Sequence, residues 1–390
     1  MARLVIVSVV LLAFTCSCGG GDSSVVTGAA RMDDYLPLLK GRRVAVTANQ
    51  TTLVGSAHLV DTLISRGVNV VTIFAPEHGF REMAAAGEII RGGVDEKSGI
   101  KVVSLYGNRY FKPQPADLED VDIVIFDIQD VGARFYTYIS TMHYVMEACA
   151  ENGKSCLILD RPNPNGFYVD GPILEPAFRS FVGMHPVPVV HGMTIGEYAM
   201  MINGEGWLEG AVTCDLQVME CLNYTHATGY ELPVRPSPNL PNQTSVYLYP
   251  SLCFFEGTNI SVGRGTPYPF QVLGAPGLEG KYEFTFTPVS LPEAGNPPHK
   301  DMACYGIDLR DALGRGIVPV PFLNLGWLID IRNAYPDREN FFRTYFNTLA
   351  GTATLRQQIE EGMTAEEIRR TWEPGLEAFG KIRRKYLLYD

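Results

Sequence analysis

The chain has 390 residues, of which 46% are hydrophobic and 19% are charged. This length exceeds one ordinary hydrophobic core and predicts two domains, and the composition excludes a largely disordered protein. The formal net charge of −11 argues against a nucleic-acid partner, because no basic surface is apparent that would neutralise phosphates.

The first residues are typical of a signal peptide. Arg3 precedes an apolar run over residues 4–14, which is too short to span a bilayer. A cysteine pair, Cys16 and Cys18, and a glycine- and serine-rich stretch follow, as at a bacterial lipoprotein cleavage site. We expect a signal peptide over 1–17, a lipid anchor on Cys18 and a flexible tether over 18–30. Lipidation of Cys16 and a plain secretory signal are the alternatives.

Six further cysteines are spread through the rest of the chain: Cys149, Cys156, Cys214, Cys221, Cys253 and Cys304. None has the C-x-x-C spacing of a zinc site, and a chain of this size does not need disulfides to fold. We expect buried free thiols for most of them. Cys149 with Cys156, and Cys214 with Cys221, are the candidates for disulfides.

From about residue 30, short apolar runs alternate with helical patterns. The runs at 44–46, 68–74, 102–105, 123–126 and 156–159 are continuously apolar, which predicts parallel strands covered on both faces. Helical spacing follows over 59–64 and over about 136–150. The pattern predicts a Rossmann-like α/β domain over 31–233. Neither a dinucleotide fingerprint nor a Walker A loop occurs, so a nucleotide is not the expected ligand.

The chain then changes character. Thr194 and Glu197 form a capping-box pattern that predicts a helix to about Asn203. Prolines become dense at 233–238, which marks the passage into a smaller α+β domain over 234–390. This domain is rich in loops to about residue 300, and helical patterns follow over 324–334, 338–349 and 364–385.

Every predicted strand ends in polar residues. They are Thr47 and Asn49, Glu77 and His78, Tyr106, Asp127 and Asp130, and Asp160 and Arg161. The carboxyl ends of parallel strands meet at one edge of a sheet, where open α/β sheets bind ligands. Paired carboxylates at such an edge can perform acid–base chemistry on a glycosidic bond.

The sequence blocks around these residues resemble the NamZ-type exo-β-N-acetylmuramidases, a glycosidase family long catalogued as a domain of unknown function. The matching blocks are APEHGFR (75–81), FDIQDVGARFYTY (126–138), LDRPNPNG (159–166), VDGPIL (169–174), FVGMHPVPVVHGMTIGE (181–197), PSPNLP (236–241), FEGTNISVGRGTPYPFQ (255–271) and the closing KYLLYD. The resemblance implies a Rossmann-like domain, a smaller second domain and a cleft between them. It implies removal of N-acetylmuramic acid (MurNAc) from the non-reducing end of peptidoglycan fragments, by hydrolysis of its β-1,4 bond to N-acetylglucosamine (GlcNAc), without a metal or organic cofactor.

The predicted general acid is Glu77, because a carboxyl near Phe74 and Phe80 can be desolvated enough to stay protonated near neutral pH. The alternative is a structural carboxylate that caps a turn or pairs with Arg81. His78 either orients Glu77 or binds a sugar hydroxyl, and the alternative is a packed histidine that supports the loop. A metal role is not expected of it, because no histidine or cysteine lies at ligand spacing.

Asp127 and Asp130 compete for the role of second catalytic carboxylate. Asp127 is favoured because it directly follows the apolar run, and Asp130 is the better candidate to anchor Arg134. Glu256, in the second domain, enters the site only if the cleft brings the domains together. Retaining, inverting and substrate-assisted routes all remain open from the sequence.

MurNAc carries a lactyl carboxylate, so a specific enzyme needs a cation. The candidate arginines in matching blocks are Arg134, Arg161 and Arg264, and the alternative for each is that it braces a loop. Sugar-stacking candidates are Tyr136, Tyr138 and Tyr268, and Asn239 is the candidate contact for the acetamido or hydroxyl groups. Gly263 and Gly265 are expected to let the backbone approach the ligand.

These expectations describe a lipoprotein of the bacterial cell envelope, facing the periplasm or the cell surface, that acts on peptidoglycan-derived saccharides. The alternative is a surface glycan-binding lipoprotein without activity. An amidase or phosphoesterase is disfavoured because the nucleophile elbow and metal motifs are missing. The oligomeric state stays open.

Overall fold

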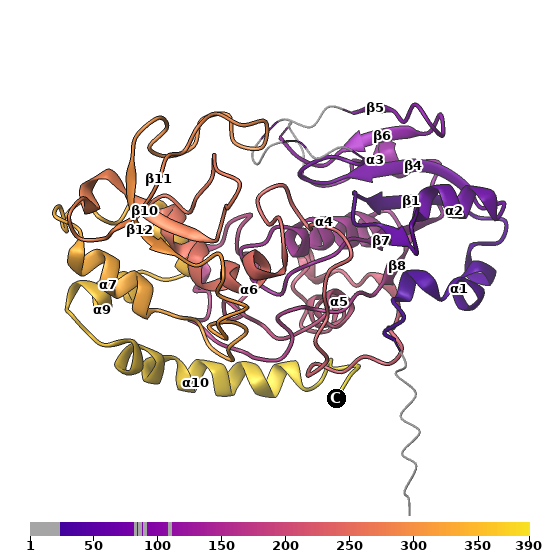
Figure 1. Ribbon diagram of the computed structural model, residues 1–390. Coiled ribbons are helices and arrows are strands. Elements are labelled where there is room, and N and C mark those ends of the chain that lie inside the picture. The colour runs from indigo at the N-terminus through magenta and orange to yellow at the C-terminus, as the bar shows by residue number, and fades with distance from the viewer. Residues whose placement is uncertain (1–23, 82–83, 85–87, 89–91, 108–110) are drawn as a thin grey trace, which may run out of the picture.

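The computed structural model describes residues 24–81, 84, 88, 92–107 and 111–390 (Figure 1). The predicted signal peptide and Cys18 lie outside these residues, and their assignment stays a prediction. No helix in the described part is long and apolar enough to cross a membrane.

A seven-stranded sheet forms the centre of the first domain, in the order β5-β6-β4-β1-β7-β8-β9. Every neighbouring pair is parallel except β5 with β6. The strands are β1 (Arg43–Ala48), β4 (Asn69–Ala75), β5 (Gly93–Val94), β6 (Lys101–Ser104), β7 (Ile123–Asp127), β8 (Ser155–Leu159) and β9 (Asp215–Met219). The predicted mostly parallel, Rossmann-like sheet is confirmed.

Helices cover both faces of this sheet, which explains why its strands are continuously apolar. Val44 and Val46 of β1 belong to a buried cluster with α1 (Met32–Leu39) and α2 (Leu59–Ser65). Ala45, between them, belongs to the larger cluster on the opposite face, with α4 (Tyr138–Glu151) and α5 (Ile195–Gly204). A short hairpin of β2 (Leu53–Val54) and β3 (Ala57–His58) and the short α3 (Pro115–Leu118) complete the domain.

The helix predicted from the capping box is α5. The Thr194 side chain accepts a hydrogen bond from the backbone N–H of Glu197, and the Glu197 carboxylate accepts from the backbone N–H of Thr194. Both orphan donors at the helix start are satisfied in this way.

The second domain contains a small antiparallel sheet and most of the remaining helices. The strands, in the order β10-β12-β11, are β10 (Val272–Ala275), β12 (Cys304–Asp308) and β11 (Phe284–Phe286). The helices are α6 (Gln243–Leu252), α7 (Gly326–Ala334), α8 (Tyr345–Ala350), α9 (Thr354–Glu360) and α10 (Ala365–Arg383). The helix predicted over 338–349 forms only from Tyr345. Phe341 and Phe342 are instead buried, and Phe342 forms a β-bridge with Thr258.

The end of the chain returns to the first domain. In Figure 1, α10 runs along the lower edge of the molecule toward α5. The backbone N–H of Leu388 then donates to Glu197, and the Tyr389 hydroxyl donates to Asp160 at 2.6 Å. The closing segment therefore binds both domains into one body.

The flexible tether predicted over 18–30 is shorter than expected. Val26 forms a β-bridge with Leu222, and the backbone N–H of Gly28 donates to the carbonyl of Asp160. Ala29 is fully buried in the short 3-10 helix Gly28–Ala30. These contacts with distant residues hold residues 26–30 against the sheet.

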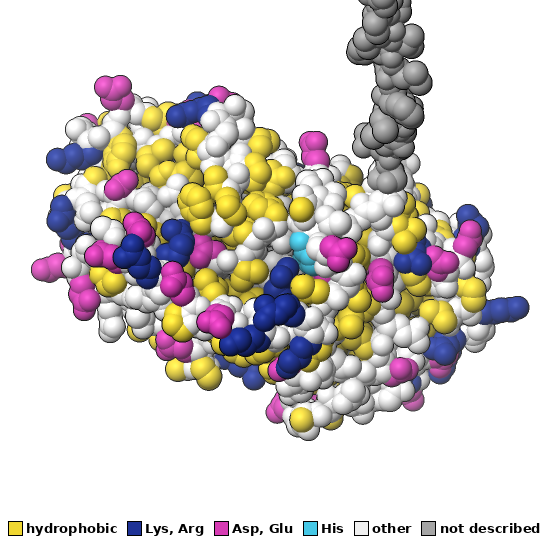
Figure 2. All heavy atoms as spheres, turned by 90° about the horizontal axis from the view of Figure 1, so that it is seen from below, with side chains coloured by type: hydrophobic (Ala, Val, Ile, Leu, Met, Phe, Trp, Pro, Cys, Tyr) yellow, Lys and Arg dark blue, Asp and Glu magenta, His cyan; other side chains and the backbone are white. Residues whose placement is uncertain are grey.

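The six described cysteines are free and buried, as expected for most of them, and neither candidate disulfide forms. In Figure 2, basic and acidic side chains are interspersed with apolar ones over the face that contains α10.

Candidate active site

A cavity of about 180 Å³ lies at the carboxyl end of β4 and is lined from both domains. The first domain contributes Glu77, His78, Tyr106, Phe135, Tyr136, Thr137, Tyr138, Phe181 and Val182. The chain beyond residue 233 contributes Ser237, Asn239, Leu240, Tyr249, Cys253, Glu256, Arg264, Phe270, Tyr345 and Leu349. Four predicted site residues with acidic or basic side chains therefore meet in one place: Glu77, His78, Glu256 and Arg264.

Glu77 follows β4 by two residues and is half-buried in the cavity wall. The Thr137 hydroxyl donates a hydrogen bond to its Oε2 at 2.9 Å. Burial, together with the Glu77 carboxylate beside it, raises the pKa of Tyr106. The alternative partner expected for Glu77, Arg81, forms ion pairs with Asp61 and Asp95 at 2.7 Å each.

His78 has the left-handed backbone conformation, with φ of 70°, and its ring lines the same cavity. Its Nδ1 lies 2.8 Å from the carbonyl oxygen of Ala84. Burial lowers the pKa of His78, so its ring is neutral at neutral pH. A neutral ring that donates from Nδ1 to a carbonyl presents Nε2 as an acceptor. His78 is therefore suited to accept a hydrogen bond from a ligand hydroxyl.

Glu256 and Arg264 form an ion pair on the wall that the second domain contributes. The Arg264 Nε donates to Glu256 Oε1 at 2.6 Å, and its guanidinium lies 5.2 Å from the centre of the Phe270 ring. Both neighbours of Arg264 are glycines with positive φ, Gly263 at 83° and Gly265 at 80°. A Cβ on Gly263 would lie 2.7 Å from the carbonyl oxygen of Tyr268, so the loop that presents Arg264 requires glycine there.

Asp127 lies elsewhere, and its environment is structural. Its side chain is fully buried, and both oxygens accept from Arg161, at 2.6 and 2.8 Å. Strand β1 separates β7 from β4, so the two strand ends lie about 10 Å apart. Neither Asp127 nor Arg161 lines the cavity that contains Glu77.

Asp130 also lies outside the lining of that cavity and does not anchor Arg134. Its Oδ1 accepts from the backbone N–H of Gly132 at 2.7 Å, and burial raises its pKa to about 7. Arg134 instead donates to four backbone carbonyls, those of Pro172, Val187, Leu349 and Ala350. The predicted Asp130–Arg134 pair is therefore wrong. Arg134 is fully buried and joins the two domains, and it is not among the residues that line the cavity.

The remaining predicted contacts divide between the cavity and the surface. Tyr136 and Tyr138 line the cavity edge to face, with ring centres 5.0 Å apart, and the Tyr136 hydroxyl donates to the carbonyl of Pro236. Asn239 lines the cavity as well. Tyr268 is not among the lining residues and lies under the guanidinium of Arg310.

Several lining residues were not singled out from the sequence. Thr137 stands inside the FDIQDVGARFYTY block, so its position was marked but its contact with Glu77 was not. Tyr249 and Tyr345 come from α6 and α8, and no local pattern distinguishes them from core aromatics. Among the described residues, no group of three or more histidine, cysteine, aspartate and glutamate side chains is arranged to hold a metal ion.

Comparisons with known proteins point to one family over most of the described chain. The family model for the N-terminal part of the exo-β-N-acetylmuramidase NamZ matches residues 44–244, and the model for its C-terminal part matches 247–389. The peptidoglycan β-N-acetylmuramidase NamZ of Bacillus subtilis (strain 168) is 41% identical over 379 residues, which cover 92% of this chain and 89% of that protein.

Two solved structures have the same fold. Both are crystal structures of DUF1343 family proteins from Bacteroides fragilis NCTC 9343, and each covers 94% of this chain and 99% of its own. One is 47% identical with a TM-score of 0.85, and the other is 27% identical with a TM-score of 0.78. Because both family models and the Bacillus subtilis relative match nearly the same length of sequence, the chain belongs to the exo-β-N-acetylmuramidase NamZ family.

Proposed function

We propose that the protein is an exo-acting β-N-acetylmuramidase that hydrolyses the β-1,4 bond between a non-reducing-end MurNAc and GlcNAc in peptidoglycan fragments. The observation that carries the proposal is that one cavity of a chain in this family holds Glu77, Glu256 and Arg264. A cavity of about 180 Å³, walled by both domains, suits a terminal sugar better than the middle of a long chain.

Glu77 acts as the general acid and protonates the glycosidic oxygen as its bond to the anomeric carbon breaks. Thr137 fixes the carboxyl by donating to Oε2. A water molecule supplies the hydroxyl group that adds to the anomeric carbon, and its remaining proton passes to a carboxylate of the site, so that the site regains the proton that Glu77 gave to the leaving oxygen. The products are free MurNAc and a saccharide that begins with GlcNAc.

Glu256, rather than Asp127 or Asp130, supplies the second carboxylate at the site. It lines the cavity with Glu77, whereas Asp127 is occupied by Arg161 and Asp130 is buried outside the lining. Arg264 holds Glu256 through Nε, and its two terminal nitrogens suit the lactyl carboxylate of MurNAc. His78 accepts a hydrogen bond from a sugar hydroxyl.

The protein acts in the bacterial cell envelope, held to a membrane by a lipid on Cys18. The support for this is the order of Arg3, the apolar run and the cysteine pair at the start of the sequence. Radiolabelled fatty acid should be incorporated by the full chain expressed in a bacterial host, and not by its Cys18→Ala variant.

The activity is tested with the disaccharide MurNAc–GlcNAc and the purified protein. Mass spectrometry should detect free MurNAc with the native chain, and Glu77→Gln should reduce its release by about two to four orders of magnitude. The matched control is Glu377→Gln, an exposed position on α10 where release should not change. No release by the native chain would refute the muramidase activity, and equal release by Glu77→Gln would remove Glu77 from the acid role.

A further inference from the structure

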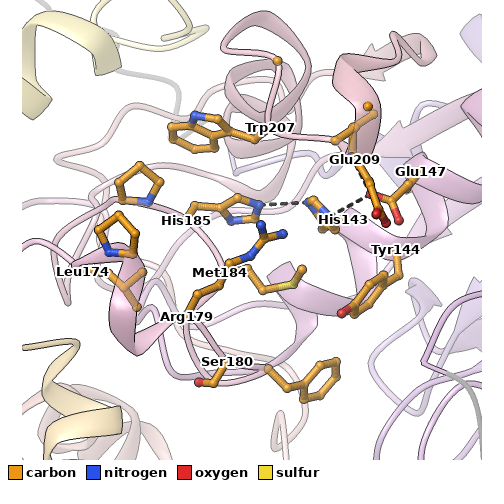
Figure 3. Close-up of a pocket in the computed structure, with 16 residues that line it drawn as sticks. His143, Tyr144, Glu147, Leu174, Arg179, Ser180, Met184, His185, Trp207 and Glu209 are labelled. Carbon is orange, nitrogen blue, oxygen red and sulfur yellow. Dashed lines mark hydrogen bonds and ion pairs between the residues drawn. The ribbon is translucent and has the colours of Figure 1, made fainter.

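A second and larger cavity, of about 880 Å³, adjoins the candidate active site at Phe181. Figure 3 shows the residues that line it. Its walls come from α4, from the segment 174–186 and from the loop 206–210. This volume is within the range of small-molecule binding sites, about 300–1,000 Å³, whereas the cavity around Glu77 is smaller than that range. Space for a ligand larger than one sugar is therefore found in the second cavity.

The two cavities share a wall. Phe181 lines both of them. Helix α4 also passes from one to the other, because Thr137 and Tyr138 at its start line the first cavity and His143, Tyr144 and Glu147 line the second. From Thr137 to Glu147 the helix rises about 15 Å. A saccharide that begins beside Glu77 can therefore continue into the second cavity along α4.

An aromatic ridge, made of Tyr106, Phe111, Tyr144 and Phe181, connects the two cavities. The Phe181 ring stacks on Phe111 with centres 4.3 Å apart, and its centre is 6.0 Å from Tyr106 and 6.4 Å from Tyr144. Phe111 is 38% exposed. Aromatic rings with a free face offer apolar area at little cost in side-chain entropy, and the apolar face of a pyranose ring packs well against them.

The second cavity also contains a cation. The side chain of Arg179 points into the cavity toward His185, as Figure 3 shows, and it forms no ion pair with any residue the structure describes. Burial lowers the pKa of His185 well below its ordinary value, so this neighbour is neutral. An unpaired guanidinium beside a neutral ring favours a ligand carboxylate.

The wall behind Arg179 is held rigidly. His185 Nε2 lies 3.0 Å from His143 Nδ1, and His143 Nε2 lies 3.3 Å from Glu147. The Trp207 ring stacks on His185 with centres 5.0 Å apart. Glu147 is in turn bound by Lys112 and by the backbone N–H of Glu209. A wall tied together in this way is preorganised, which lowers the entropic cost of binding a ligand.

We propose that the second cavity binds the part of the glycan that continues beyond the first GlcNAc, with Arg179 contacting the lactyl carboxylate of the next MurNAc and Tyr144 packing on a face of a sugar in that part. The inference rests on the proposed muramidase activity and extends it. It assigns the protein a preference for fragments longer than a disaccharide.

The test compares kcat/KM for MurNAc–GlcNAc and for the tetrasaccharide MurNAc–GlcNAc–MurNAc–GlcNAc. The native chain should prefer the tetrasaccharide. Tyr144→Ala should lose about threefold to tenfold in kcat/KM on the tetrasaccharide and leave the disaccharide unchanged. The matched control is Tyr305→Ala, a half-exposed tyrosine on β12 that should change neither rate.

Arg179→Gln, at an exposed position, separately tests the contact with the lactyl carboxylate of the second MurNAc. Its loss should be confined to the tetrasaccharide and should disappear when GlcNAc replaces the second MurNAc. A loss that persists with GlcNAc there would refute the contact with the carboxylate. Equal rates of the native chain on both substrates, or equal losses of Tyr144→Ala on both, would refute the second site. Failure of the native chain to release MurNAc from either substrate would instead refute the proposed activity.

Discussion

Asp127 stabilises the fold and takes no part in catalysis, so Asp127→Asn should lower the stability of the protein and leave its kcat nearly unchanged. Arg161 donates to both oxygens of the fully buried Asp127. The substitution removes the negative charge and leaves the Arg161 guanidinium buried without a counter-ion. Loss of one partner from a buried ion pair costs about 3–5 kcal/mol. We therefore expect the free energy of unfolding to fall by about that amount.

The unfolding of each variant is followed by circular dichroism in urea, and MurNAc release is measured where the variant is still folded. Asp127→Asn should have a lower urea midpoint and a nearly unchanged kcat. The matched control is Asp122→Asn, because Asp122 pairs with Arg43 where both side chains are more than a third exposed. Such a surface pair contributes about 0–1 kcal/mol.

A double variant separates the lost charge from other effects of the substitution. Replacement of both partners, Asp127→Leu with Arg161→Met, should recover much of the stability, because apolar residues can replace a buried ion pair at little cost. An unchanged urea midpoint for Asp127→Asn together with a loss of about a thousandfold in kcat would refute the reasoning. Asp127 would then be a catalytic carboxylate.

Two further predictions concern Glu77 and Asp130. Thr137→Val removes the hydroxyl that donates to Glu77 Oε2. The kcat for MurNAc–GlcNAc should therefore fall by about threefold to tenfold, with little change in KM. A change confined to KM would contradict a role of Thr137 in positioning the acid. For Asp130, burial raises the pKa from 3.8 to about 7, so the folded chain holds a proton between these values that the unfolded chain has lost. This contribution to stability is complete below about pH 4 and is lost as the pH rises to about 7. Asp130→Asn does not titrate, so its stability relative to the native chain should increase between about pH 4 and about pH 7. Thermal unfolding at several pH values measures this difference. A difference between the two proteins that does not vary with pH would show that Asp130 is ionised throughout.

Local sequence patterns predicted the elements that depend on near neighbours. The apolar run at 44–46 is buried on both faces as β1, and the Thr194 capping box starts α5. The same reasoning failed where a distant contact decides the conformation. Phe342 pairs with Thr258, which delays α8 to Tyr345, and Val26 pairs with Leu222, which shortens the tether.

In the candidate site, too, the sequence predicted what depends on near neighbours and missed what depends on distant contacts. The position of Glu77 after an apolar run was sufficient to mark it, because strand ends of a parallel sheet share one edge. The partners of the other charged residues were not visible in the sequence. Arg134 and Arg264 are both arginines in matching blocks, yet Arg134 is enclosed by four carbonyls and Arg264 pairs with Glu256 in the cavity.

The sequence by itself therefore determined the parallel α/β domain, the strand-end acid Glu77 and, through its ordered blocks, the family. Only the tertiary structure decided that Glu256 meets Glu77 in one cavity, that Arg161 neutralises Asp127, and that a second cavity lies along α4. The physical reason is distance along the chain. Periodicity and capping act over a few residues, whereas the pairing of charges between residues far apart depends on how strand order and domain packing place them.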